Sequence, residues 1–299
     1  MDSSSRKFWH VWEKQLRLHQ WVKNLLLFIP LLAAHKIDDI ALLISGLFAF
    51  LLFSLCSSSV YLLNDLLDLE DDRQHPHKRF RPLAAGILSK REVSHVFPAL
   101  LLSAFSGAIW IMPWKFTLTM LCYYLLTLAY SLILKRVMAM DVVVLAMLYT
   151  VRIIAGTFAF NVSLTFWMLA FSMFLFLSLA LVKRYAELRE LSSKGETERT
   201  RGRGYYPSDE EMISSLGATS GYLAVMVLAL YIQDQSTLAL YRHPQVIWLA
   251  CPLLLYWITR TWMITHRGWM HEDPVVFAMT DRVSLILCGI FSAVFWLAI

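Results

Sequence analysis

The sequence has few charged residues for its length. Asp, Glu, Lys and Arg make up 16% of 299 residues, and the mean hydropathy is +0.55. In a soluble domain, about a quarter of the residues are charged. Several apolar stretches reach the roughly 20 residues that cross a bilayer as a helix. The scarcity of charge therefore excludes an ordinary soluble protein and indicates a polytopic membrane protein.

Cysteine is also scarce, and the period-two alternation of transmembrane strands is missing. The four cysteines, Cys56, Cys122, Cys251 and Cys288, are spread over apolar stretches, which suits packing rather than disulfides or a metal cluster. Long apolar runs favour helices, because only helices and closed barrels satisfy their backbone in lipid. The charged N-terminal residues lack the apolar core and cleavage site of a signal peptide, so we expect no removed leader. The expected fold class is an all-α polytopic membrane protein.

Hydropathy predicts about nine transmembrane helices in a single domain, residues 1–299. The predicted spans are 22–35, 40–64, 94–112, 115–134, 140–160, 164–183, 212–232, 246–264 and 281–298. With the N-terminus inside, 23 of the 27 Lys and Arg fall in cytoplasmic segments and 3 in the opposite loops, which agrees with the positive-inside rule. The sequence pI near 9.0 is then a topology signal, and we expect no nucleic-acid partner.

An acidic row follows the second predicted span. It consists of Asn64, Asp65, Asp68 and Asp72. Residues 64, 68 and 72 are four apart, so they would stack on one face of a helix. Their oxygen atoms suit Mg²⁺, which takes few carboxylates and completes its shell with water and phosphate. The row therefore predicts a magnesium site for a phosphorylated ligand; a solvated cytoplasmic loop is the alternative.

A group of basic residues comes directly after the acidic row. It consists of His75, His77, Lys78, Arg79 and Arg81. Arginine binds phosphate through two parallel hydrogen bonds, and lysine acts as a point charge. Acidic residues followed by basic residues at this spacing fit a magnesium–diphosphate complex. A zinc site at the two histidines, or bases that only set the topology, are the alternatives.

Polar residues at other spans are further candidates for substrate binding. Gln20, Lys23 and Asn24 mark the cytoplasmic entry of the first span, where Lys23 either binds phosphate or reaches the membrane interface. Arg152 lies inside a span, which costs at least about 2.5 kcal/mol unless it faces a polar cavity. We therefore expect Arg152 to line the substrate pocket; a structural pair between helices is the alternative. Asp281 either holds a base of the pocket or caps the last helix.

The motif "ND-xx-D-xxx-D" followed by "HPHKRFRPLAAG" resembles the first signature of the UbiA superfamily of intramembrane prenyltransferases. The resemblance covers essentially the whole chain. It implies nine helices, a polar pocket on the cytoplasmic side and Mg²⁺ held by the acidic row. It also favours phosphate binding by the residues at the mouth of the pocket, which include Lys23, Lys78, Arg79 and Arg81.

The sequence departs from this family at the second aspartate-rich motif. The equivalent stretch, "LVKRYAELREL", has Lys183, Arg184, Tyr185 and Glu187 in place of the carboxylates. With "HQWVKN" at 19–24 and "TDRV" at 280–283, it resembles the branch that contains decaprenyl-phosphate phosphoribosyltransferase. That resemblance implies phosphates held by Lys183 and Arg184, and ribose hydroxyls oriented by Tyr185 and Glu187. The expected catalytic residues are Asp65, Asp68, Lys183 and Tyr185.

The expected function is Mg²⁺-dependent transfer of a 5-phosphoribosyl group from phosphoribosyl pyrophosphate to a polyprenyl phosphate. An ordinary UbiA prenyltransferase that uses a prenyl diphosphate is one alternative. A membrane transporter or lipid-phosphate binding protein is another, although polar groups clustered on one side argue against it. The expected partners are the lipid substrate, a soluble phosphorylated donor and membrane lipid; a homo-oligomer is left open. We expect an integral protein of the bacterial inner membrane, with the N-terminus and active site cytoplasmic.

Overall fold

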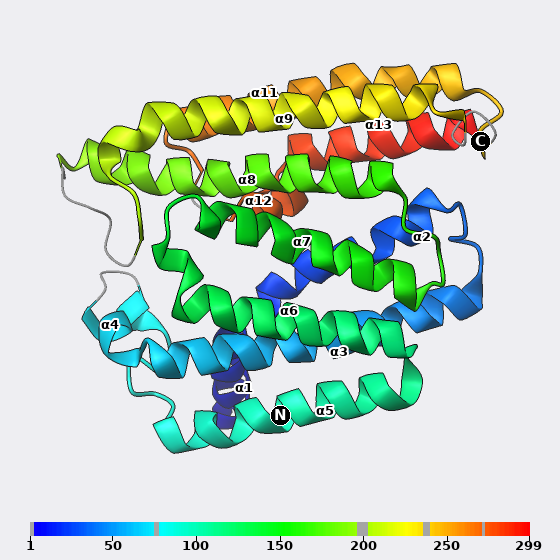
Figure 1. Cartoon of the computed structure of the whole chain (residues 1–299). Coiled ribbons are helices and arrows are strands. Elements are labelled where there is room, and N and C mark those ends of the chain that lie inside the picture. The colour runs from blue at the N-terminus through cyan, green and yellow to red at the C-terminus, as the bar shows by residue number, and fades with distance from the viewer. Residues whose placement is uncertain (1–2, 75–77, 196–202, 236–239, 271–272) are drawn as a thin grey trace. The chain divides into compact units, whose positions relative to one another are not determined.

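The structure is a computed structural model, and it describes residues 3–74, 78–195, 203–235, 240–270 and 273–299. Within these ranges every regular element is a helix (Figure 1), so the all-α prediction is confirmed there. The chain forms two compact units, residues 1–131 with 151–163 and residues 132–150 with 164–299. The single domain over 1–299 stays a prediction.

The first unit contains the N-terminal helix and the acidic row. Asp39 caps the helix that carries the first residues of the row, and Ser89 and Glu92 form a capping box at the start of the following long helix. Pro30 lies in the first turn of a short helix that continues a 3-10 helix. The elements are α1 (Ser3–Leu16), η1 (Leu18–Phe28), α2 (Ile29–Ala33), α3 (Ile40–Leu67), α4 (Leu69–Gln74), η2 (Lys78–Phe80), α5 (Lys90–Ile111) and α6 (Trp114–Leu132).

Helix α7 (Met140–Ala159) contributes residues to both units. Its C-terminal part belongs to the first unit and contains Gly156. A methyl group on Gly156 would lie 2.1 Å from the carbonyl oxygen of Leu27 in η1, a distance that no side chain tolerates. The missing side chain therefore lets η1 and α7 come into backbone contact.

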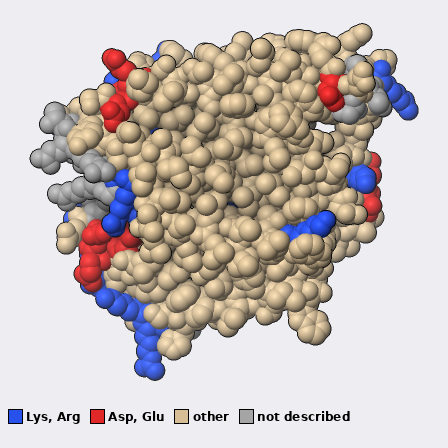
Figure 2. Space-filling model, viewed as in Figure 1, with Lys and Arg blue, Asp and Glu red and all other residues tan. Residues whose placement is uncertain are grey.

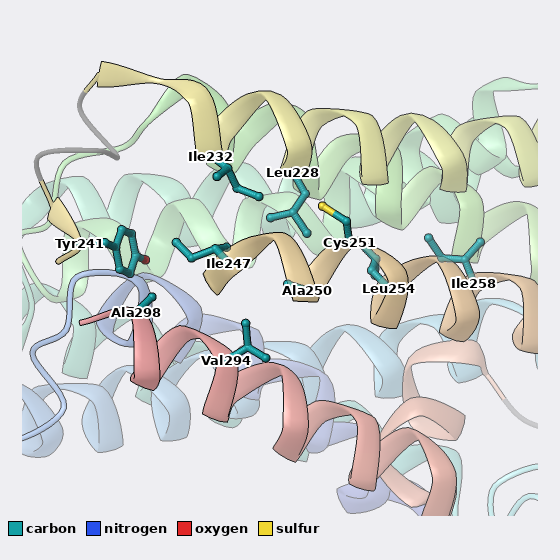
Figure 3. Packing of buried hydrophobic residues seen from close by; sticks show 10 residues of the cluster. All are labelled: Leu228, Ile232, Tyr241, Ile247, Ala250, Cys251, Leu254, Ile258, Val294 and Ala298. Atoms are coloured by element: carbon teal, nitrogen blue, oxygen red, sulfur yellow. The ribbon is translucent and has the colours of Figure 1, made fainter. Parts of the chain in front are cut away.

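The second unit is built around a bundle of long helices that run side by side (Figure 1). Its core includes Leu228, Ile247, Cys251, Leu254 and Val294, which point toward one another from three helices and a 3-10 turn (Figure 3). In lipid such association depends on close packing of side chains. The elements are η3 (Leu134–Arg136), α8 (Phe166–Ser193), η4 (Pro207–Asp209), α9 (Glu210–Gln233), η5 (Pro244–Leu249), α11 (Ala250–His266), α12 (Pro274–Thr280) and α13 (Arg282–Ala298).

Six helices of the described residues are long and apolar enough to cross a membrane, or seven if α12 and α13, which are bent by 78°, form one span. The nine predicted spans therefore stay a prediction. Large apolar side chains such as Trp110 and Phe166 are 88% and 73% exposed, as expected for lipid-facing positions. On one face of the molecule, charged side chains form only small groups among other residues (Figure 2).

The predicted end of the sixth span at residue 183 is wrong as a helix boundary. Helix α8 continues to Ser193, because the stretch "KRYAELREL" consists largely of good helix formers. Lys183, Arg184, Tyr185 and Glu187 therefore lie on a helix and not at the start of a loop.

Candidate active site

The acidic row lies where α3 passes into α4. Helix α3 ends at Leu67, Asp68 is its C-cap, and Asp72 belongs to α4. The backbone N–H of Asp68 donates to Asn64 O at 2.9 Å, and that of Asp72 donates to Asp68 O at 2.8 Å. The four-residue spacing thus persists, although the single continuous helix expected through residue 72 is interrupted.

Arg81 joins the acidic row to the basic residues that follow it. Its Nη1 atom lies 3.1 Å from Asp65 Oδ1 and 2.5 Å from Asp72 Oδ2, and both carboxylates are nearly fully buried. Lys78 Nζ lies 3.8 Å from Asp72 Oδ1. Arg79 is exposed and stacks on the Phe80 ring. The structure thus brings together the acidic row and two of the predicted bases; His75 and His77 lie outside the described residues.

Two residues of the N-terminal segment also reach Asp65, and neither was predicted as a site residue. Gln15 Nε2 donates to Asp65 Oδ2 at 2.8 Å, and Arg17 Nη2 donates to Asp65 Oδ1 at 2.5 Å. The Arg17 guanidinium also lies 4.9 Å from the centre of the Tyr61 ring. Arg17 has a left-handed backbone, with φ of 55°, which turns the chain from α1 into η1. These contacts join positions about 50 residues apart in sequence, so local spacing does not reveal them.

The residues of the acidic row fit a magnesium ion in the nature of their ligand atoms. The Oδ1 atom of Asn64 is buried and has no hydrogen-bond partner, although a buried acceptor normally has one. In the part of the chain that the structure describes, no three His, Cys, Asp or Glu side chains group closely enough to hold a metal ion. Mg²⁺ usually takes only one or two carboxylates with water and phosphate. Asn64, Asp65 and Asp72 supply an amide oxygen and two carboxylates, which is a set of ligand atoms of that kind.

Arg152 is the centre of a buried polar cluster in the first unit. Its Nε donates to Asn24 Oδ1 at 2.9 Å, and its Nη2 donates to Tyr123 OH at 3.0 Å. Asn24 in turn donates to Ser54 Oγ at 2.9 Å. Lys23 is buried on the same 3-10 helix, and Gln20 is half-buried there. The cluster joins η1, α3, α6 and α7, so Arg152 lies among polar side chains, and its place in a substrate pocket stays a prediction.

In the second unit, Lys183 is held by Asp273. Lys183 Nζ donates to Asp273 Oδ2 at 3.0 Å, and Tyr149 OH donates to Asp273 Oδ1 at 3.0 Å. The Asp273 side chain is 7% exposed, whereas that of Lys183 is 34% exposed. The predicted phosphate ligand Lys183 is therefore oriented by a buried carboxylate and still reaches the surface.

Arg184 has a different environment from its neighbour. Its side chain is 0% exposed and lies 2.6 Å from Asp141 Oδ2, with a second ion pair to Glu187. Arg203 Nε lies 3.3 Å from Glu187 Oε2, so two cations and two carboxylates balance. Direct contact between Arg184 and a phosphate, as predicted, would require these ion pairs to open.

Tyr205, in the segment before η4, also contacts the ion-pair cluster around Arg184. Its hydroxyl donates to Asp141 Oδ1 at 2.6 Å and accepts from the backbone N–H of Ala139 at 2.9 Å. Burial, followed by the hydrogen bond to Asp141 and its negative charge, raises the pKa of Tyr205 above its ordinary range. Tyr205 therefore stays a neutral hydrogen-bond donor at physiological pH. Local spacing does not reveal Tyr205, because its partners lie 64 and 66 residues away.

The other two candidates of the second unit have definite partners. Tyr185 OH and His266 Nδ1 share a hydrogen bond of 2.8 Å. Asp281 accepts two hydrogen bonds from Arg260, at 2.7 and 3.1 Å, and caps α13 through the backbone N–H of Ser284. Both expectations for Asp281, a partner for a base and a helix cap, are thus confirmed as contacts, and its substrate binding stays a prediction.

The UbiA prenyltransferase family profile matches residues 25–285. The chain belongs to this family. It contains the polar residues of the acidic row, Arg152 and the Lys183–Glu187 stretch within the matched range. As a UbiA-family protein it is a membrane-embedded transferase.

Three curated relatives align with nearly the whole of this UbiA-family chain. It is 37% identical to the uncharacterized protein y4nM of Sinorhizobium fredii over 96% of this chain, but it spans only 55% of that protein. It is 37% identical to the nodulation protein NoeC of Azorhizobium caulinodans, over 90% of this chain and 87% of that one. It is 31% identical to decaprenyl-phosphate phosphoribosyltransferase of Mycobacterium tuberculosis, over 95% and 91%.

The fold is that of solved UbiA proteins. The UbiA homologue from Archaeoglobus fulgidus bound to DMAPP and Mg²⁺ superposes with a TM-score of 0.68 at 18% identity, over 96% of this chain and 98% of that one. At this identity the likeness concerns the fold alone.

Proposed function

We propose that this protein transfers a 5-phosphoribosyl group from phosphoribosyl pyrophosphate to a polyprenyl phosphate, with Mg²⁺, and releases pyrophosphate. The observation that carries the proposal is the stretch from Lys183 to Glu187, where cations replace the carboxylates of ordinary UbiA enzymes. The likeness to a decaprenyl-phosphate phosphoribosyltransferase over 95% of the chain supports it. Two phosphorylated substrates need more cationic ligands than a prenyl diphosphate and an aromatic acceptor do.

The acidic row and the basic residues after it would bind the pyrophosphate group. Asn64, Asp65, Asp68 and Asp72 would hold Mg²⁺, which supplies positive charge to the pyrophosphate as it leaves. Arg81 and Lys78 lie against these carboxylates and would bind phosphate oxygens directly. Arg79 is exposed beside them.

The other polar residues would hold and orient the two substrates. Lys183, with Asp273 behind it, would bind a phosphate, and Arg184 would bind phosphate once its ion pairs with Asp141 and Glu187 open. Tyr185 and Glu187 would orient the ribose hydroxyls. Gln20, Lys23, Asn24 and Arg152 would contact the lipid phosphate; Asp281 would act through Arg260.

The reaction needs positioning more than proton transfer. The bond from C1 of the ribose to the pyrophosphate oxygen breaks with its electron pair leaving on oxygen, and C1 gains oxocarbenium character. An anionic oxygen of the polyprenyl phosphate attacks the opposite face and forms the new C1–O bond with inversion. Because that oxygen carries no proton, no general base is required, and Asp65, Asp68, Lys183 and Tyr185 act through placement and charge.

A parallel assay in detergent with Mg²⁺ tests the proposal. One tube receives phosphoribosyl pyrophosphate and a polyprenyl phosphate, and the other receives a prenyl diphosphate and 4-hydroxybenzoate. We expect pyrophosphate release and a phosphoribosylated lipid in the first tube only. A prenylated aromatic product formed only in the second tube would contradict the proposal.

The ordinary prenyltransferase reaction is the second candidate, since the chain belongs to a prenyltransferase family. The transporter alternative has no support from the family. Substrate-dependent flux in sealed vesicles, without a lipid product, would be required to revive it. For the enzyme we propose the bacterial inner membrane, with the active site on the cytoplasmic side where the basic loops gather.

A further inference from the structure

Gln15 lies at the last turn of α1 and is almost fully buried, with 1% of its surface exposed. Its two amide atoms have different partners. Nε2 donates to Asp65 Oδ2 at 2.8 Å, and Oε1 accepts from the backbone N–H of Leu83 at 3.0 Å. One side chain thus connects the start and the end of the polar segment 65–83.

This connection determines where Arg81 lies. Arg81 is two residues before Leu83, and its guanidinium contacts Asp65 and Asp72. Asp65 Oδ2 accepts a hydrogen bond from Gln15, and Asp65 Oδ1 accepts hydrogen bonds from Arg17 and Arg81. The same buried amide thus contacts the Asp65 carboxylate and the backbone two residues after Arg81.

The chemistry of the contact requires glutamine. The carboxylate of Asp65 needs a donor and the N–H of Leu83 needs an acceptor, and a single primary amide supplies both. Glutamate keeps the length and the acceptor but, when ionised, has no donor. Asparagine keeps both groups on a side chain one methylene shorter.

We propose that Gln15 is a positioning residue that holds the acidic row and the basic segment in register for metal and phosphate binding. The inference rests on the proposed role of Asp65 as a metal ligand. Gln15 acts on metal binding through the Asp65 carboxylate that it holds, and on phosphate binding through the backbone next to Arg81. The N-terminal helix is thereby part of the active site.

The test compares Gln15→Leu and Gln15→Asn with Ser58→Ala. Ser58 is the matched control, because its hydroxyl donates to Leu16 O at 2.9 Å and accepts from Trp21 Nε1 at 2.9 Å. Ser58 thus holds the N-terminal segment around Leu16 and Trp21 against α3 and does not contact Asp65 through these bonds. The readouts are Mn²⁺ binding to the purified protein without a phosphoribosyl donor, the half-saturating Mg²⁺ concentration for pyrophosphate release, and thermal stability.

We expect Gln15→Leu and Gln15→Asn, which both lose the contact with Asp65, to weaken Mn²⁺ binding and raise the half-saturating Mg²⁺ concentration about tenfold or more, as loss of a partner behind a metal ligand does. Ser58→Ala should lower thermal stability and leave the metal response unchanged. A wild-type metal response in Gln15→Leu, or an equal change in Ser58→Ala, would overturn the proposal. Mn²⁺ binding does not depend on which donor the enzyme uses, so failure here is separable from failure of the proposed reaction, and Asp65→Asn tests the metal site itself.

Discussion

Arg81 is the residue at which the acidic and basic parts of the candidate site meet. In Arg81→Gln, the KM for phosphoribosyl pyrophosphate should rise about 10- to 100-fold, because a charge-assisted hydrogen bond contributes about 1.5–3 kcal/mol. Steady-state kinetics at saturating Mg²⁺ measure this KM. Arg73→Gln is the control, since Arg73 pairs only with the exposed Glu70 among the contacts described for it. An unchanged KM in Arg81→Gln would contradict the assignment.

Although Arg81→Gln should bind the phosphoribosyl donor more weakly, we expect it to bind a metal ion more tightly when no donor is present. Arg81 is one of the cations that pair with Asp65 and Asp72, so its loss removes a positive charge and the two carboxylates should attract a metal ion more strongly. Arg81→Gln should therefore bind Mn²⁺ more tightly than the wild-type protein does, measured by titration of the free ion. Weaker binding would show that Arg81 supports the metal site instead of competing for it.

The sequence predicted the chemistry of the candidate site, but it did not predict all the residues that form it. The acidic row and its bases are local in sequence, so their spacing pointed to one another. Gln15, Arg17 and Tyr205 were missed because each reaches its partner from a distant segment, and none belongs to a motif. Arg184 was assigned to phosphate from its charge alone, and only the fold reveals that Asp141 and Glu187 surround it.

At the scale of the elements, the contact between η1 and α7 depends on Gly156. Gly156→Ala should destabilise the protein by about 1–3 kcal/mol, as overpacking does. The added carbon would clash with a backbone carbonyl, which cannot rotate away as a side chain can. Thermal unfolding in detergent measures the change.

Gly289 provides the control for that experiment. A methyl group on Gly289, in α13, would meet nothing within 4 Å. Gly289→Ala should therefore be neutral or stabilise by up to about 1 kcal/mol through helix propensity. Equal effects of the two substitutions would contradict the packing account of Gly156.

The segment before η4 is fastened by the Tyr205 hydroxyl, and this contact predicts a pH dependence. The raised pKa of Tyr205 means that the folded state keeps the phenol proton after the unfolded chain loses it at pH of about 10. The stability advantage of the wild-type protein over Tyr205→Phe should be constant below that pH and shrink as the pH rises through it. Thermal unfolding of both proteins at pH 7–11 measures it, and an advantage that grows with pH would contradict the account.

Hydropathy predicted where helices lie but not their hydrogen-bonding pattern or their ends. Each of the nine predicted ranges contains helical residues in the described chain. The 3-10 form of η1, the interruption at Asp68 and the extension of α8 to Ser193 went unpredicted. Apolar composition reports contact with lipid, whereas these features depend on packing at Gly156, on capping and on polar helix formers outside the apolar run.

At the scale of the whole molecule, the number of spans determines the side on which the C-terminus lies. Nine or seven spans place it opposite the N-terminus, whereas six would place both on one side. The basic loops predict a cytoplasmic N-terminus, so a phosphatase fused after Ile299 should be active and a fluorescent protein there should be dark. The reverse pattern would contradict the predicted topology.

The most direct test of the central claim offers both reactions to one enzyme. Purified protein with Mg²⁺ receives phosphoribosyl pyrophosphate, a polyprenyl phosphate, a prenyl diphosphate and 4-hydroxybenzoate together, and mass analysis identifies the lipid products. The account predicts a phosphoribosylated lipid that is lost with a chelator and in Asp68→Ala. A prenylated aromatic as the main product, or an Asp68→Ala protein with full activity, would contradict it.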